Sequence, residues 1–160
     1  MEQRSNYMEA APKLVHAMFA LGAPVAHSGL ETSLIDLINF RVSQLNGCAY
    51  CLDMHSKDLR AAGETEQRLY VLEAWRESPF YSERERAALA WAEAVTLLTN
   101  KEVPDDVYDQ ARSHFNEQEL AMLTLAVVAI NSWNRLNIAF RTTPGNYQPG
   151  MFKTTSPAKA

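Results

Sequence analysis

Apolar side chains recur every three to four residues along most of this chain, which is the period of an amphipathic α-helix. No stretch alternates apolar and polar residues in the way a half-buried strand would. The pattern predicts helices over residues 9–21, 33–45, 48–63, 65–76, a stretch opening at Ser82, residues 104–115, and residues 117–139. Residues 120–130 are apolar on all sides, which predicts burial in the domain centre or between subunits. The expected fold class is all-α.

Helix boundaries are marked by residues that cap or break helices. Ser82 with Glu85, and Asn116 with Glu119, have the spacing of capping boxes, in which a side chain and a backbone N–H bond reciprocally. Gly63 is suited to the left-handed conformation that ends many helices. The Asn-Gly pair at 46–47 predicts a break between two helices, and Pro104 suits a first helical turn.

The length of 160 residues predicts a single domain. A domain of this size buries roughly two-thirds of its unfolded surface, so it needs no disulfide or metal to fold. Residues 1–145 are expected to form the helical domain. Residues 146–160 lack periodicity and are rich in proline, glycine and threonine, so they predict an extended tail.

Charge and hydropathy exclude two classes of partner. The formal net charge of −4, without any lysine or arginine run, argues against nucleic acid, which requires a basic surface. The longest apolar stretch, LTLAVVAI, is too short to span a membrane, and the N-terminus has no apolar signal core. We therefore expect a cytoplasmic protein. In that compartment a close cysteine pair is more often catalytic or metal-binding than a permanent structural disulfide.

The two cysteines of the chain lie in the segment NGCAYCLDMH at residues 46–55. On a helix, Cys48, Cys51 and His55 would line one face, because they are three and four residues apart. Cysteines so placed can approach disulfide geometry, and the unpaired N–H groups of a first helical turn stabilise a thiolate. His55 could exchange a proton near neutral pH. The segment predicts a thiol redox centre.

Spacing alone leaves open which cysteine attacks. The helix terminus favours Cys48, whereas the histidine, one turn from Cys51, favours Cys51. A structural zinc site needs four ligands, and no second pair of cysteines or histidines has ligand spacing. Redox chemistry is therefore favoured over a metal site or an inert buried pair, and neither a metal nor a cofactor is expected.

Asp36 lies on the helix before the cysteines and has two possible roles. The turn at residues 46–47 could fold that helix back and bring the carboxylate near His55, where it would orient the ring or relay protons. Alternatively, Ser33 and Asp36 have capping-box spacing, so Asp36 could cap its own helix. Spacing alone favours the cap.

Three stretches, RVSQLNGCAYCLDMHSKDLRAAG, SERERAALAWAEAVT and NSWNRLNIAFRTTPG, resemble the AhpD-like (alkylhydroperoxidase-type) branch of the carboxymuconolactone decarboxylase superfamily. The resemblance covers roughly residues 12–145. It implies an all-α AhpD-like bundle that assembles into homotrimers or homohexamers. It also implies reduction of organic hydroperoxides or hydrogen peroxide by the dithiol, without metal or organic cofactor. The true decarboxylases lack the cysteine pair, so their activity is not expected here.

The resemblance also implies roles for individual residues. Cys51 matches the cysteine that attacks peroxide, Cys48 the one that resolves the sulfenic acid, and His55 the relay histidine. Asp36 stands where the family has a relay glutamate. Tyr50 replaces a histidine of well-studied members; a phenol with a pKa of about 10 can donate a hydrogen bond but is a poor base at neutral pH.

The expected function is that of a thiol-dependent peroxidase whose disulfide is reopened by an external dithiol. In some relatives that reductant is a lipoyl-bearing protein. Two alternatives remain on the same fold: a disulfide reductase acting on a protein or small thiol, and a non-enzymatic metal-binding or assembly protein.

Overall fold

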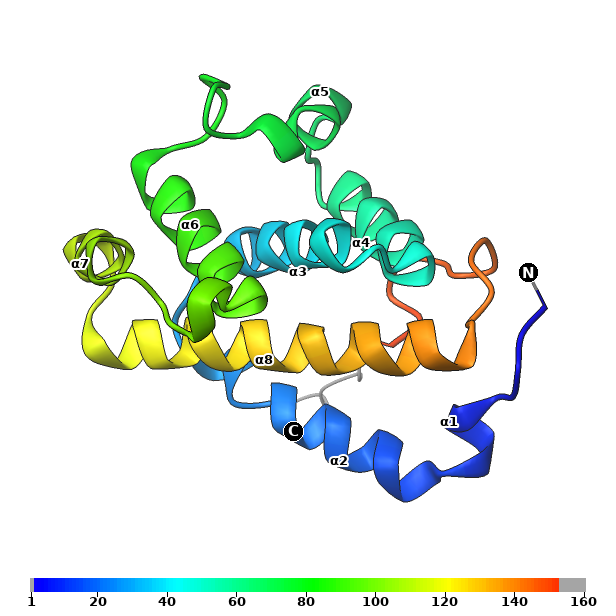
Figure 1. Cartoon of the computed structure of the whole chain (residues 1–160). Helices are drawn as coiled ribbons and strands as arrows, with labels where there is room; N and C mark the ends of the chain where they lie inside the picture. Colours follow the sequence, from blue (N-terminus) through cyan, green and yellow to red (C-terminus); the bar gives the residue numbers. More distant parts are fainter. Residues whose placement is uncertain (1, 153–160) are drawn as a thin grey trace, which may run out of the picture.

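A computed structural model describes residues 2–152, and within this range the chain forms helices and connections without a strand (Figure 1). The expectation of an all-α fold is confirmed. The α-helices are α1 (Tyr7–Ala10), α2 (Pro12–Gly22), α3 (Thr32–Asn46), α4 (Ala49–Ala61), α5 (Glu66–Tyr70), α6 (Glu83–Leu97), α7 (Asp105–His114) and α8 (Glu117–Phe140). The 3₁₀ helices are η1 (Val25–His27), η2 (Leu72–Ala74) and η3 (Thr99–Lys101).

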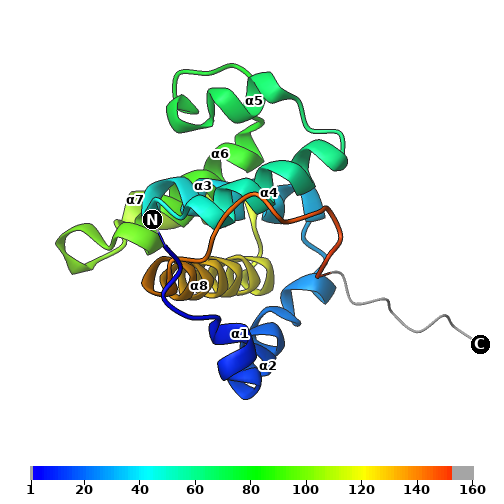
Figure 2. The ribbon, with the colours of Figure 1, turned by 90° about the vertical axis from the view of Figure 1, so that its right-hand side faces the viewer.

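Helix α8 runs through the middle of the molecule, with α3, α4 and α6 on one side and α1 and α2 on the other (Figures 1 and 2). The core lies where α3 and α6 pack against α8. Its side chains come from the predicted apolar faces and include Leu37, Ile38, Val42, Leu89 and Leu123. Each side chain of this kind stabilises the fold by roughly 1.5–3 kcal/mol when fully buried. None of the described helices is long and apolar enough to cross a bilayer.

Both predicted capping boxes are present. The Ser82 Oγ accepts from the Glu85 N–H, and the Glu85 carboxylate accepts from the Ser82 N–H, at 3.2 and 2.7 Å. Asn116 and Glu119 make the same reciprocal pair at the start of α8. These residues therefore set the first turns of the two helices that carry much of the core.

Replacing Ser82 by alanine removes one of these caps. We expect the free energy of unfolding to fall by about 1 kcal/mol, because the first-turn N–H loses its acceptor. Urea unfolding measures the change. Ser113→Ala is the control, since this exposed hydroxyl bonds only the Gln110 carbonyl inside α7, and we expect it to stay within about 0.5 kcal/mol of the parent. Equal losses in the two variants would contradict the capping role.

Three predicted boundaries are wrong. The helix expected over residues 9–21 is divided at Ala11, because Pro12 fixes the first turn of a new helix. The helix expected over 65–76 leaves the α conformation at Val71 and continues as a 3₁₀ turn. Pro104 is the N-cap of α7, just outside the first turn.

The expected all-round burial of residues 120–130 is also incorrect within one chain, because Val128 is 43% exposed. Helix α2 has no buried side chain, and its Leu14 and Phe19 are 38% and 45% exposed. The apolar pattern of a helix therefore does not reveal how much of its apolar surface is buried within a single chain. Assembly into trimers or hexamers stays a prediction.

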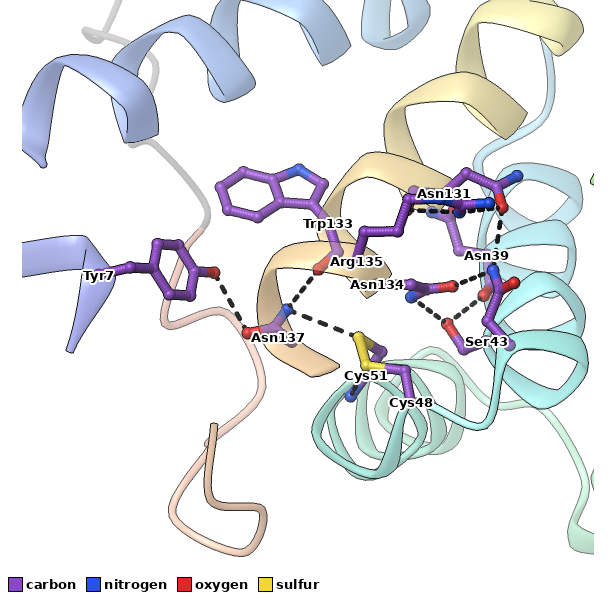
Figure 3. Close-up of a disulfide and its surroundings, with 11 residues drawn as sticks. Tyr7, Asn39, Ser43, Cys48, Cys51, Asn131, Trp133, Asn134, Arg135 and Asn137 are labelled. Carbon is purple, nitrogen blue, oxygen red and sulfur yellow. Dashed lines mark hydrogen bonds between the residues drawn. A yellow bond between two sulfur atoms is a disulfide. The ribbon is translucent and has the colours of Figure 1, made fainter. Parts of the chain in front are cut away.

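The turn between α3 and α4 places the cysteines. Gly47 adopts a left-handed conformation with φ of 68°, so the chain reverses and Cys48 becomes the N-cap of α4. The Asn46 side-chain amide donates to the Oδ1 atoms of Asn131 and Asn134 on α8, at 2.9 and 2.8 Å. Asn134 donates in turn to the Ser43 hydroxyl (Figure 3). This polar cluster fixes the turn against α8.

Residues 142–152, called here the C-terminal strap, return across α4. Lys57 donates to the carbonyls of Gly145 and Tyr147, and the Tyr147 hydroxyl donates to the Asp58 carboxylate. The strap includes the start of the predicted tail at residue 146; residues 153–160 of that tail lie outside the described residues. The strap covers the part of α4 that follows the cysteines.

Candidate active site

Cys48 and Cys51 form a disulfide at the start of α4, with Cα atoms 5.3 Å apart. Both residues are only 1% exposed. The N–H of Cys51 donates to the Cys48 Sγ at 3.3 Å, so the first-turn donor of α4 points at the sulfur of Cys48. The sequence-based expectation that this turn brings the sulfurs within bonding distance is confirmed.

A cavity of about 420 Å³ adjoins the disulfide. Cys51 lies on its wall, and Cys48 does not. Most of the wall is apolar and comes from α2, η1, the connection before α3, α3 itself and α8, including Phe19, Val25, Leu30, Ile35, Ile130 and Trp133. The polar wall residues are Thr32, Asn39, Tyr50, His55, Asp58, Asn137 and Tyr147, of which Asn137 contacts the Cys51 sulfur. The arrangement exposes one sulfur to a mainly apolar space.

His55 lies one turn after Cys51 on the same wall and is 7% exposed. Within residues 2–152 its Nε2 has no hydrogen-bond partner. Burial lowers the pKa of His55 to about 4, although the Asp58 carboxylate acts in the opposite direction. The imidazole is therefore neutral at pH 7 in the disulfide form, and its expected proton exchange in the dithiol form stays a prediction.

Tyr50 lies half-buried on the cavity wall beside Cys51. Burial, and secondarily the charge of Asp53, raise the pKa of its phenol. Tyr50 therefore keeps its proton at neutral pH and can donate a hydrogen bond into the cavity, as its chemistry suggested.

Asp36 is half-buried on α3 and does not lie on the cavity wall. The capping interpretation of Asp36 is wrong, because α3 begins at Thr32 with Glu31 as N-cap and no side chain caps it. Ser33 lies inside the first turn instead. The relay role of Asp36 stays a prediction.

Sequence reasoning missed Asn137, whose Nδ2 donates to the Cys51 Sγ at 3.6 Å across 86 residues of chain. It also missed Tyr7, whose hydroxyl donates to the Asn137 Oδ1 at 3.2 Å. A weak signal existed, because asparagines recur every third residue in NSWNRLN, at Asn131, Asn134 and Asn137, directly after the apolar stretch of the same helix. No pattern in the sequence pointed to Tyr7.

The described residues contain no group of three or more histidine, cysteine, aspartate or glutamate side chains that could hold a metal ion. The helical fold, with a disulfide on the wall of a cavity, defines an all-α protein with a dithiol–disulfide centre. The sequence profile of the carboxymuconolactone decarboxylase family matches residues 12–94. The chain belongs to this family.

Two proteins are similar to this chain over most of its length. It is 46% identical to the uncharacterized protein YdfG of Bacillus subtilis (strain 168) over 139 residues, covering 87% of this chain and 95% of YdfG. A crystal structure of an Agrobacterium tumefaciens protein of unknown function, provisionally named an antioxidant-defence AhpD, superposes with a TM-score of 0.86. That pair shares 43% identity over 91% of this chain and all of the other. The expected AhpD-like resemblance is therefore confirmed.

The debrominase Bmp8 is more distant, with 21% identity and a TM-score of 0.74 over 87% of this chain and 75% of that one. This likeness shows a shared fold alone.

Proposed function

We propose that this protein is a thiol-dependent peroxidase that reduces hydroperoxides through a cycle of the Cys48–Cys51 pair. One observation carries the proposal: the disulfide presents Cys51, and not Cys48, to a cavity next to His55, whose Nε2 has no hydrogen-bond partner in the described chain. The cavity volume falls within the range of small-molecule sites, roughly 300–1,000 Å³. Its apolar wall suits the organic group of a hydroperoxide.

In the proposed cycle, the Cys51 thiolate attacks the outer oxygen of the hydroperoxide and breaks the O–O bond. Cys51 becomes a sulfenic acid, and the alkoxide leaves as an alcohol after taking a proton. The Cys48 thiol then attacks the sulfenic sulfur, forming the disulfide and releasing water. An external dithiol reduces the disulfide by exchange and is itself oxidised to a disulfide.

His55 is suited to handle protons in this cycle. A thiolate at Cys51, one turn away, is an opposite charge that favours protonation of the imidazole. The resulting imidazolium lies on the cavity wall, where the leaving alkoxide needs a proton. Asp36 keeps its predicted relay role, and a slower formation of the Cys51 thiolate in Asp36→Asn would support it.

The buried sulfurs disfavour the alternative of a reductase for protein disulfides. Both cysteines are 1% exposed, so a folded protein substrate could not reach them without movement of the surrounding helices or the strap. A small disulfide could enter the cavity, and reduction of oxidised glutathione separates that case from peroxide reduction.

In a second candidate reaction, the two cysteines reduce a halogenated aromatic ring instead of a hydroperoxide. The rings of Phe19, Tyr50 and Trp133 line the cavity, which suits a planar aromatic ligand, and the debrominase Bmp8 shares the fold. Here two thiols would become the disulfide while a carbon–bromine bond is replaced by carbon–hydrogen, with release of bromide and a proton. Bromide release from a brominated pyrrole, against turnover of an organic hydroperoxide, decides between the two.

The direct test of the proposed function is a stoichiometric oxidation. We expect the reduced protein to consume one equivalent of cumene hydroperoxide, yield one equivalent of cumyl alcohol and become lighter by about 2 Da. Mass spectrometry of the intact chain and of the peptide containing both cysteines gives the result. A reduced protein that leaves the hydroperoxide unconsumed would overturn the proposal.

A further inference from the structure

The proposed cycle requires a thiolate at Cys51, and apart from the neighbouring His55 the usual sources of thiolate stabilisation are not directed at it. A thiolate is commonly stabilised by a nearby cation or by the first-turn N–H groups of a helix. In this site, the N–H group of Cys51 points at the Sγ of Cys48. Over residues 2–152, the cavity wall carries no lysine or arginine.

The titratable groups that face the cavity are few. They are Tyr50, His55 and Asp58 from α4, and Tyr147 from the strap. The wall residues that α2, η1, α3 and α8 contribute within the described chain are all neutral. Tyr7 of α1 lies just beyond, bonded to Asn137. A negative sulfur therefore has only a neutral polar donor on the α8 side.

Asn137 supplies that donor. Its Nδ2 carries two hydrogens; one is directed to the Cys51 Sγ at 3.6 Å and the other to the Trp133 carbonyl at 3.0 Å (Figure 3). Asn137 is 5% exposed, so water does not compete freely for this amide. The Trp133 carbonyl can only accept, which fixes the NH₂ group, not the oxygen, on the side of the sulfur.

Tyr7 reinforces the same orientation from the opposite end of the amide. Its hydroxyl donates to the Asn137 Oδ1 at 3.2 Å, and its ring lies 5.3 Å from that of Phe140. Burial raises the pKa of Tyr7 to about 12, so the hydroxyl keeps its proton at neutral pH. The N-terminal segment is tied to the end of α8, because Arg4 donates to the carbonyls of Phe140 and Ala139.

From this geometry we infer that Asn137 is a catalytic residue that stabilises the Cys51 thiolate through its N–H group, with Tyr7 as the residue that positions it. The inference rests on the proposed role of Cys51 as the attacking sulfur. A hydrogen bond to an ionised acceptor is stronger than one to a neutral acceptor, so the contact strengthens when the thiolate forms. Each sulfur therefore has its own hydrogen-bond donor: the N–H group of the first α4 turn for Cys48, and the Asn137 amide for Cys51.

The test measures the pKa of the Cys51 thiol in Cys48→Ser protein, where Cys51 is the single cysteine. Serine is a good N-cap, so this background preserves the start of α4. The pH dependence of thiolate ultraviolet absorbance and of iodoacetamide alkylation gives the pKa. We expect Asn137→Leu to raise this pKa by about one, because a hydrogen bond to the charged form is lost.

Two more variants sharpen this test. Asn137→Asp keeps the shape but places a carboxyl group against the sulfur, and the pKa should rise at least as much. Tyr7→Phe removes one oxygen and leaves the ring, and a smaller rise is expected. Thr124→Val is the matched control, because it removes a half-buried polar group of α8 that bonds Trp91 and the Leu120 carbonyl, and neither the sulfur nor the turn that places the cysteines. Its pKa should match that of the background protein.

These measurements involve no peroxide, so they separate this inference from the proposed function. Circular dichroism identifies any variant that fails to fold. Tyr7→Phe removes only one oxygen, so the Cys51 pKa can still be measured in this variant if the Asn137 variants do not fold. An unchanged Cys51 pKa in the folded Asn137 variants overturns the inference, as does an equal rise in Thr124→Val. A raised pKa in a protein inactive toward hydroperoxides would leave the inference standing and reject only the peroxidase.

Discussion

Replacing Cys51 by serine is expected to abolish hydroperoxide turnover, with a fall of at least about 10³-fold, as expected for loss of a nucleophile. The serine oxygen cannot be oxidised to a sulfenic acid, and Cys48 does not lie on the cavity wall. Consumption of cumene hydroperoxide with excess dithiothreitol, corrected for the reaction without protein, measures the rate.

Cys48→Ser is the matched control for this prediction, because the substitution is the same and the site is equally buried. Reduced beforehand and freed of dithiothreitol, this variant should complete one round of peroxide reduction and stop as a sulfenic acid at Cys51. Dimedone then labels Cys51, and mass spectrometry of the peptide locates the adduct. Substantial turnover by Cys51→Ser, or a dimedone adduct on Cys48 in that variant, would reverse the two roles.

The parts of the structure that sequence predicted best depend on neighbours along the chain. The capping boxes at Ser82 and Asn116 are contained within four residues each, and both formed as expected. The disulfide is similarly local, because Cys48 and Cys51 share one helical turn. Periodicity located α3, α4, α6 and α8 because each has a regular apolar face packed in the core.

The features that sequence did not predict depend on contacts between distant segments. Asn137 reaches the site because α8 packs beside α4, and Tyr7 because α1 contacts the end of α8; no spacing rule connects residues so far apart. The cap misassigned to Asp36 was an error of one boundary, since Ser33 proved to lie inside α3. The pKa of His55 required knowledge of its burial, which no local pattern contains.

The buried His55 is expected to have a second large effect, on the free energy of unfolding. Burial lowers the pKa of His55 from about 6.5 to about 4. Between these values the unfolded chain binds a proton that the folded protein does not, so acid favours unfolding. Stability from the neutral His55 is present above pH 6.5 and is lost as pH falls toward 4. From pH 7 to pH 4 the loss is about 3 kcal/mol, because a tenfold difference in proton affinity between the folded and unfolded chain corresponds to about 1.4 kcal/mol.

The contribution of His55 is isolated by comparison with His55→Asn, whose side chain is polar but does not titrate in this range. Carboxylates that titrate near pH 4 affect both proteins equally and cancel in the difference. We expect urea unfolding of the disulfide forms to show that the wild type loses about 3 kcal/mol more than His55→Asn between pH 7 and pH 4. His27→Asn, which alters an exposed histidine, should follow the wild type. Parallel curves for wild type and His55→Asn would mean that the folded protein binds a proton at His55 as readily as the unfolded chain, and the neutral imidazole assigned to the disulfide form would be rejected.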